Sequence, residues 1–468
     1  MSADSSRPSY EDLLAMVADL TARLDTALSR INVLEARLGM TSKNSSKPPS
    51  SDGLAKPAPK SLRERTGRGP GRPPGQPGMT LRQVSDPDGI VQHLPAVCAG
   101  CGDGLSGGVE VSTAVRQVFD IPEPRILVTE HRLVTLACPC GHHTTATAPP
   151  EATAPVSYGP RAAAVGVYLL HGQFLSIKRT AQALSEVFGL PVAASTVSGW
   201  VKRTATPIID TVLPVITNRI TAAPVACFDE TGLRTAGKLA WLHTACTPTD
   251  VLLSVHPRRG GVAMDAIGIL PRFTGIAVHD AFQAYDTYRH LDSALCNAHA
   301  LRELIYVTDT ANGDIAALAT QATNALRRLW RLVRTARATD TTPDPAAIAE
   351  QQHLLRSALV IGAQTTAGPG SALIRKYHAL FARLRDHRDE YLRFVTNPAV
   401  PFDNNTAEQA LRMPKLRVKV SGSMRTLTGA EHFAAIRSYT ATAAKHGLNT
   451  LDVLTRAVTG NPWIPATS

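Results

Sequence analysis

The first strong pattern in the chain is a seven-residue repeat of apolar side chains between residues 11 and 40. Four heptads fill both seam positions, with Val17, Leu24, Ile31 and Leu38 in one and Leu13, Leu20, Ala27 and Leu34 in the other. This spacing predicts a two-stranded coiled coil that joins two copies of the chain. A single amphipathic helix packed on the next domain would give the same pattern.

Beyond residue 85, short apolar runs of strand length alternate with longer helical stretches. Helical periodicity covers residues 155–210 and 313–395, and the last clear helices follow Asp403 and Gly429. The strand-like runs are Val115–Ile121, Ile126–Ala137, Pro224–Phe228, Leu239–Ala245, Val251–Val255 and Gly275–Val278. Since 468 residues exceed one core, this order predicts a multidomain α/β protein.

The stretch between the repeat and the first strand-like run cannot form a core. It is rich in Pro, Gly, Ser, Lys and Arg, and eight basic but only two acidic residues lie between Lys43 and Arg72. Together with a net charge of +11, this favours an extended linker that binds a polyanion. Arg68 and Arg72, the latter within Gly71–Pro73, resemble an arginine hook for the DNA minor groove. A solvated tether is the alternative.

Four of the seven cysteines form two close pairs, Cys98 with Cys101 and Cys138 with Cys140. The chain shows no secretory signal and no apolar run of membrane length, so we expect a reducing cytoplasm, where such pairs more often hold metal than form disulfides. Two knuckles supply the four thiolates of a structural zinc site. The second pair is one residue short, so His142 or His143 could replace Cys140. Unliganded thiols in a small core are the alternative.

Two consecutive helices are expected around residue 190. Ser176 can cap a helix that ends at Gly189, and Ser195 can cap a second helix, Thr196–Thr204. A short turn between such helices is typical of a helix-turn-helix, although any helical domain can contain such a pair. The side chains expected on the DNA are Thr196, Ser198, Lys202 and Arg203, with Val197 and Trp200 inside.

Three acidic residues have settings that suit catalysis. Asp229 and Asp280 each follow an apolar run where a strand would leave the sheet, and Glu408 lies on a helix that Asp403 can cap. Converging carboxylates hold two magnesium or manganese ions for in-line phosphoryl transfer. Exposed strand-end acids and a Glu408–Arg412 helix pair would explain the same residues without chemistry.

The order of these motifs resembles the transposases of the bacterial insertion sequence 66 family along nearly the whole chain. The matching segments are Thr41–Asp52, Asp229–Thr231, Asp280–Tyr285, Cys296–His299 and Asp403–Arg412. The resemblance implies a ribonuclease-H-like core with Asp229, Asp280 and Glu408 as its catalytic triad, and a helical insertion between Asp280 and Glu408. For Cys296 and His299, packing beside the active site is favoured over a separate metal site.

The resemblance has three departures. Ala281 and Phe282 replace a usual Gly-Tyr, the second cysteine pair is short, and Ala300–Arg302 replaces basic residues, which bears on peripheral DNA contacts. Beyond the triad, Arg412 starts a basic run in which alternation suggests an extended segment that binds phosphate, with a solvated face as the alternative. The run continues with Lys415, Arg417 and Lys419.

Together these features predict seven parts. They are a coiled coil (1–42), a basic linker (43–84), a zinc-binding domain (85–150), a helix-turn-helix region (155–210), the core's first part (220–305), a helical insertion (306–395) and the core's second part with the C-terminal helices (396–468). The expected activity is metal-dependent cleavage at transposon ends and joining to target DNA by a bacterial, nucleoid-associated homo-oligomer. Accessory transposition proteins are candidate partners. A non-enzymatic DNA-binding regulator and a nuclease that does not join ends are the rival interpretations.

Overall fold

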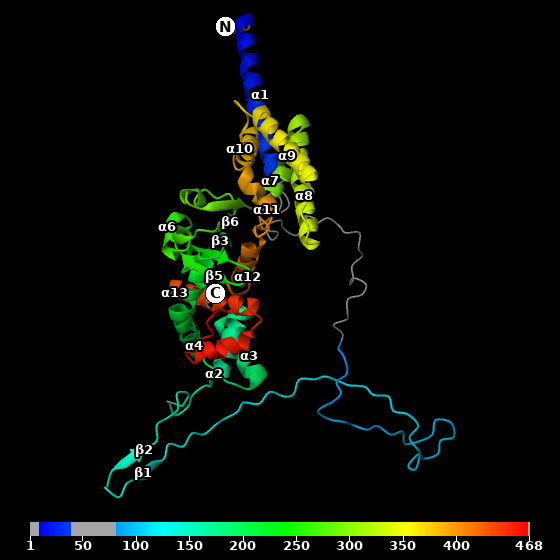
Figure 1. The fold of residues 1–468 in the computed structure, drawn as a ribbon, viewed down its shortest axis with the longest axis vertical. Helices are drawn as coiled ribbons and strands as arrows, with labels where there is room; N and C mark the ends of the chain where they lie inside the picture. The colour runs from blue at the N-terminus through cyan, green and yellow to red at the C-terminus, as the bar shows by residue number, and fades with distance from the viewer. Residues whose placement is uncertain (1–8, 39–80, 153, 467–468) are drawn as a thin grey trace, which may run out of the picture.

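The computed structural model describes residues 9–38, 81–152 and 154–466 (Figure 1). Arg68 and Arg72 lie outside the described residues. The strands are β1 (Thr135–Ala137), β2 (His143–Thr145), β3 (Val225–Thr235), β4 (Lys238–Cys246), β5 (Val251–His256), β6 (Ile276–His279) and β7 (Asp292–Leu295). None of the described helices is both long and apolar enough to span a membrane.

Helices make up most of the remaining described chain. The α-helices are α1 (Tyr10–Leu38), α2 (Pro160–Val167), α3 (Ile177–Phe188), α4 (Ala194–Pro207), α5 (Leu213–Thr221), α6 (Gly261–Ile267), α7 (Asn297–Thr310), α8 (Gly313–Ala338), α9 (Pro345–Thr365), α10 (Ala372–Asp386), α11 (Arg388–Thr396), α12 (Asn405–Ser421), α13 (Leu427–Lys445) and α14 (Thr450–Val458). Short π or 3₁₀ turns are η2 (Tyr168–Gly172), η3 (Ile208–Val212), η4 (Leu270–Arg272) and η5 (Tyr285–Thr287).

The central sheet has five strands in the order β5-β4-β3-β6-β7. Strands β3, β4 and β5 are antiparallel neighbours, whereas β6 and β7 run parallel to β3. The sequence placed the end of the first strand at Phe228, but β3 continues to Thr235 and turns back through Ala236 and Gly237, both at positive φ. A two-residue turn of this kind fits a twisted hairpin, which carries the strand through polar residues.

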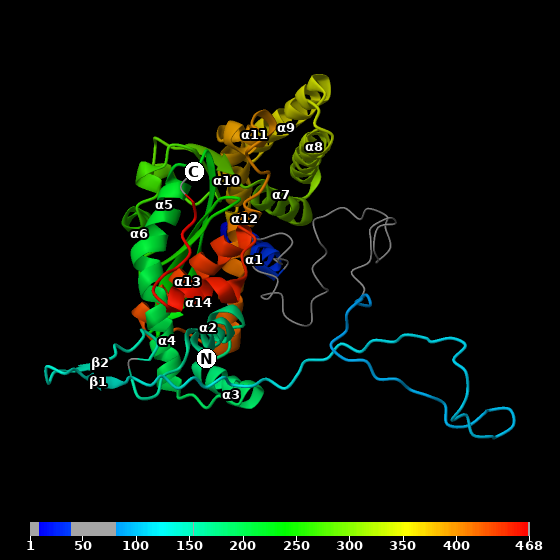
Figure 2. The same cartoon turned by 60° about the horizontal axis from the view of Figure 1, so that its bottom comes forward.

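Both faces of the sheet are covered (Figure 2). Cys227 and Leu233 face a core shared with helices α7–α12, whereas Ala226 and Phe228 face a core shared with α2–α5, α13 and α14. Side chains alternate along a strand, so Asp229 shares the α12 face with Cys227. The expected helical stretch at 313–395 is confirmed as α8–α11, which lie between β7 and α12.

The two helices expected near residue 190 are present as α3 and α4. Ser176 caps α3, accepting a hydrogen bond from the Arg179 amide, and Gly189 ends it in the left-handed conformation. The expected cap at Ser195 is wrong, because α4 begins at Ala194 after an uncapped Ala193. Val197 and Trp200 of α4 are buried as expected.

The cysteine-containing segment has much less strand than its apolar pattern suggested. Of Val115–Ile121 and Ile126–Ala137, only Thr135–Ala137 forms a strand, β1, which pairs with β2. Nearly every described side chain from 81 to 148 is exposed. A strand-forming sequence needs a partner strand and a covering core, and this segment buries too little apolar surface to provide either.

Candidate active site

Asp229 lies within β3, where it pairs with Thr244 of β4. The expectation that Asp229 ends a strand is therefore wrong, because pairing with β4 continues beyond it. Pairing with β6, in contrast, stops two residues earlier, at Cys227. Burial, followed by the charges of Glu230, Asp280 and Glu408, raises the pKa of Asp229 to about 7. Asp280 and Glu408 thus act on Asp229 electrostatically, although in the described chain the three carboxylates do not form a group of ligand atoms within 4.8 Å of one another.

Asp280 directly follows β6, as its sequence setting indicated. Its Oδ1 accepts a hydrogen bond from the Phe282 amide at 3.1 Å, which fixes the carboxylate at the start of its loop. Since β6 runs parallel to β3, the C-terminal end of β6 opens beside Asp229. The two aspartates thus come from neighbouring strands.

Glu408 lies in the first turn of α12 and is positioned by Asn404. The Asn404 side chain donates to the Phe228 carbonyl at 2.7 Å. The backbone amide of Asn404 donates to Cys296 Sγ at 3.2 Å, and its backbone carbonyl accepts from the Glu408 amide at 3.1 Å. Asn404 therefore ties α12 to β3 and to the start of α7. The helix starts at Asn405 after Asn404, not directly after an Asp403 cap.

Glu408 contacts basic groups on α7, which the sequence did not pair with it. Its carboxylate lies 3.4 Å from Arg302 and 3.8 Å from His299 Nδ1. Arg302 falls in the segment whose departure from the family pattern was expected to bear only on peripheral DNA contacts, and its contact with Glu408 also places it beside the active site. Cys296, His299 and Glu408 bring one possible ligand atom each to within 4.8 Å of one another. Cys296 is fully buried and burial raises its thiol pKa to about 12, which agrees with packing beside the site.

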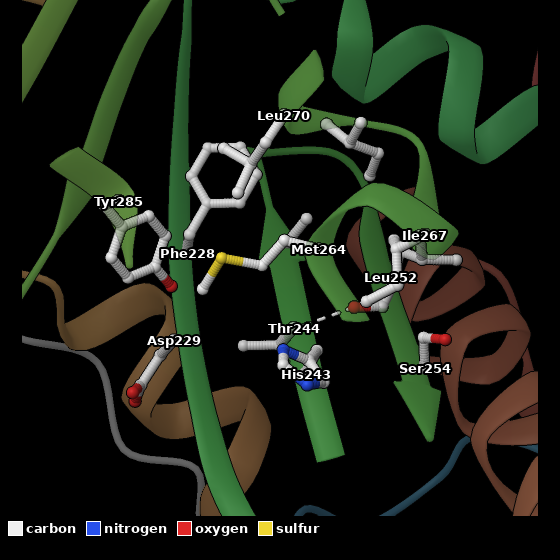
Figure 3. A pocket seen from close by; sticks show the side chains of 12 residues that line it. Phe228, Asp229, His243, Thr244, Leu252, Ser254, Met264, Ile267, Leu270 and Tyr285 are labelled. Carbon is white, nitrogen blue, oxygen red and sulfur yellow. Dashed lines mark hydrogen bonds between the residues drawn. The ribbon is translucent and has the colours of Figure 1, made fainter. Parts of the chain in front are cut away.

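The donor set at this site fits hard divalent cations. Asp229, Asp280 and Glu408 offer carboxylate oxygens, which magnesium prefers to nitrogen or sulfur, and their mutual repulsion is what a bound cation would relieve. Figure 3 shows the Asp229 carboxylate pointing away from His243 and from the apolar pocket that Phe228 and Met264 line. The carboxylate therefore faces the α12 side of the sheet.

A second, buried network lies on the opposite face of β3 and was missed by sequence reasoning. Glu230 accepts a hydrogen bond from Tyr285 at 2.9 Å and pairs with Arg259 at 2.9 Å. Arg259 also lies 3.8 Å over the ring of Phe282, and Tyr285 stacks on His279 with ring centroids 4.2 Å apart. Through Tyr285 and Arg259, Glu230 is thus linked to His279 and Phe282, which lie on either side of Asp280 in the chain. The only sequence signal for this link was the acidic residue after Asp229.

The basic run after Glu408 is helical, so the expected extended segment is wrong. Helix α12 continues through the buried Pro414 to Ser421 because it packs on β3 and β4. On a helix the alternating residues do not share a face. Arg412, Lys415 and Lys419 are exposed at helical spacing from Glu408, whereas Arg417 is half-buried and lies over the Phe433 ring. We call Arg412, Lys415 and Lys419 the α12 stripe.

The four paired cysteines stay in two separate knuckles. Amides of Cys101 and Gly100 donate toward Cys98 and lower its thiol pKa, and the His142 amide does the same for Cys140. Cys98 is half-buried and Cys140 is exposed, and thiols with a lowered pKa suit the ligation of zinc. In the described chain, the knuckles are not assembled into one group of ligands, so the fourth ligand stays open.

Three family models match the chain. Residues 155–432, which contain Asp229, Asp280 and Glu408, match "Transposase IS66 family", and residues 95–141 match "zinc-finger binding domain of transposase IS66". Residues 3–82 match "Family of unknown function (DUF6444)". No curated protein matches the chain significantly.

Proposed function

Because the chain belongs to the transposase IS66 family, we propose that it cleaves DNA at the ends of a mobile element and joins those ends to target DNA. The family match supports a transposase function and DNA binding, and the zinc-finger match supports zinc binding. The observation that carries the proposed chemistry is the placement of the three carboxylates: half-buried Asp229 on β3, Asp280 directly after the parallel neighbour β6, and Glu408 in the first turn of α12, which packs on β3.

We assign Asp229, Asp280 and Glu408 as the ligands of two divalent ions, magnesium or manganese. Two such metal ions, when bound, would activate water or a 3′-hydroxyl and would stabilise the leaving oxygen of an in-line displacement. Asp229 and Asp280 would contribute ligands from two neighbouring strands, and Glu408 would complete the ligand set from α12. His299 and Arg302 orient the Glu408 carboxylate, and Asn404 fixes its helix against β3.

The proposed core is ribonuclease-H-like. Three antiparallel strands followed by two parallel ones, with α12 packed on β3, support this assignment. Helices α7–α11 then form the insertion between the second aspartate and the glutamate.

We propose that three further parts hold DNA. Helices α3 and α4 act as a helix-turn-helix, in which Ser198, Lys202 and Arg203 are exposed and Thr196 is half-buried. The zinc module with Cys98, Cys101, Cys138 and Cys140, and the linker with Arg68 and Arg72, add contacts to the terminal repeats. The exposed basic side chains of α4 support the first assignment, the zinc-finger family match supports the second, and the basic composition of the linker supports the third.

The α12 stripe is proposed to hold the phosphate backbone next to the cut. Changing Lys415→Glu is expected to weaken duplex binding by about tenfold at low salt and to lower the salt-dependence slope by about one. A fluorescence-anisotropy titration at several salt concentrations measures both. Arg456→Glu, an exposed charge reversal on α14, is the matched control and should leave the slope nearly unchanged. Equal effects of the two variants would contradict the assignment.

Helix α1 is proposed to pair two protomers as a coiled coil. Its apolar seam residues Leu20 and Leu24 are 61% and 59% exposed, so they lack a cover within the described chain. Replacing both with lysine should raise the dimer dissociation constant by about 10²-fold or more, as measured by light scattering. Lysines at Ala22 and Thr26, off the seam, are the control. An unchanged mass for the seam variant would refute the pairing.

The proposed reaction is tested on DNA that carries the element's ends, with magnesium and with any partner proteins encoded beside the gene. Cleavage followed by joining is the expected result, and Glu408→Gln should remove both steps. Cleavage without joining would favour a nuclease. Binding without metal-dependent cleavage would favour a DNA-binding regulator, which is the rival supported by the zinc module and by α3 and α4.

A further inference from the structure

A polar cavity of about 210 Å³ lies between the π turn η2 and helices α13 and α14, away from the carboxylate site. Polar side chains from three elements line it, and they are Tyr168, His171, Gln173, Arg437, Thr440 and Thr450. None of these residues belongs to the proposed catalytic or DNA-contacting set. The cavity therefore needs its own explanation.

Two polar side chains at this cavity have nitrogen atoms without a hydrogen-bond partner. Both ring nitrogens of His171 and Nε of Arg437 are buried without a hydrogen bond. His171 is only 7% exposed. Burying such groups unpaired costs free energy, so they are usually satisfied by water or by a ligand. Two donor-bearing side chains of this kind in one cavity point to a bound group.

The charges around the cavity are of one sign. Burial and then the charges of Arg417, Arg437 and His432 depress the pKa of His171 to about 3. In the described chain, neither Arg417 nor Arg437 forms an ion pair. Glu431 acts on the half-buried His432, whose pKa Lys202 shifts in the opposite direction. A cluster of cations without a carboxylate attracts an anion.

Aromatic rings and the backbone hold this cluster in place. The Arg437 guanidinium lies 5.6 Å over Phe174, and the Arg417 guanidinium lies 5.7 Å over Phe433, which also contacts the His171 ring. Phe174 has φ of 60°, a conformation that costs free energy for a non-glycine residue, and only Gln173 separates it from the π turn. Strained residues and π turns gather at binding sites more often than elsewhere.

We propose that this cavity binds a phosphate group, with Arg437 as its main cationic contact and His171 and Gln173 as further hydrogen-bond donors. A tetrahedral anion offers acceptors in several directions, which matches donors that come from η2 and α13. The group is either a backbone phosphate of bound DNA or a free phosphate.

Titration of the full-length protein with inorganic phosphate, at constant ionic strength and without DNA or magnesium, tests the site. We expect a saturable rise in melting temperature for the wild type. Arg437→Gln should weaken the apparent affinity by about tenfold or more. Arg456→Gln on α14, which is exposed and outside the cavity, should behave as the wild type. No saturable rise, or equal affinity in Arg437→Gln, would overturn the proposal.

A second variant tests the site even if Arg437→Gln fails to fold. Ala444 is exposed at the cavity wall, and Ala444→Glu places a carboxylate there on a helix that tolerates it. Loss of the phosphate response with an unchanged or higher melting temperature in phosphate-free buffer is expected. A full phosphate response in Ala444→Glu would count against the site.

A DNA arm identifies the source of the phosphate. If a backbone phosphate occupies the cavity, a duplex with the element's end displaces inorganic phosphate, and Arg437→Gln weakens duplex binding several-fold. If free phosphate is the ligand, Arg437→Gln binds duplex normally. Both readouts are independent of strand cleavage, so failure of the proposed catalysis leaves this test intact.

Discussion

Replacing Asp229 with asparagine is expected to abolish DNA cleavage and, in the same variant, to make the magnesium-free protein more stable at alkaline pH. An amide neither carries the charge nor binds a divalent cation as the carboxylate does. Losing roughly 4 kcal/mol of transition-state stabilisation lowers the cleavage rate by about 10³-fold. Asp452→Asn, an exposed aspartate on α14, is the control and should cleave normally.

The gain in stability follows from the sign of the pKa shift. The pKa of Asp229 rises from 3.8 to about 7 on folding, mainly through burial. Between these values the folded chain binds more protons than the unfolded chain, so stability falls as pH rises from about 4 to about 7. The total loss is on the order of 4 kcal/mol above pH 7. Asparagine at this position avoids that loss.

Thermal unfolding without added magnesium, at pH 5 and pH 8, measures this effect. The difference in melting temperature between Asp229→Asn and the wild type should widen toward pH 8, while Asp452→Asn follows the wild type. Added magnesium should raise the melting temperature of the wild type more than that of Asp229→Asn. A difference that does not change with pH would mean that folding does not raise the pKa of Asp229.

Much of this site could be predicted from sequence because its residues sit in local patterns. Asp280 follows a short apolar run and does lie directly after β6. Glu408 was expected on a helix and lies in the first turn of α12. Asp229 was placed on the right strand, but at its end, because four polar or small residues after Phe228 break the apolar run. Pairing with β4 carries β3 through them, and no local pattern reports such pairing.

Other parts depended on contacts that sequence periodicity does not report. Arg259 lies 29 residues from Glu230, and Tyr285 lies 55 residues from it, yet all three meet in one buried network. Pro414 normally ends a helix, which favoured an extended segment after it. Burial of Pro414 against the sheet instead keeps α12 helical to Ser421, and this rearranges the basic run into the α12 stripe.

Arg259→Met is expected to destabilise the protein by about 2 kcal/mol at pH 8 and to lower cleavage. Methionine keeps much of the apolar contact with Phe282, but it leaves the Glu230 carboxylate, which is 1% exposed, without its cation. The expected loss stays below that of a fully buried ion pair because Arg259 itself is 38% exposed. Cleavage should fall because Phe282 and Tyr285 belong to the loop that carries Asp280.

A double variant separates charge from packing in this network. Burial, followed by the charge of Asp280, already raises the pKa of Glu230, so the cost of losing Arg259 is present at high pH and relieved as falling pH protonates the carboxylate. Glu230→Gln combined with Arg259→Met should therefore recover most of the lost stability at pH 8. If the double variant unfolds as readily as Arg259→Met, the loss lies in packing, and Glu230 does not hold the Asp280 loop through its charge. Recovery of stability without recovery of cleavage would instead assign the ion pair itself to positioning Asp280 beside Asp229.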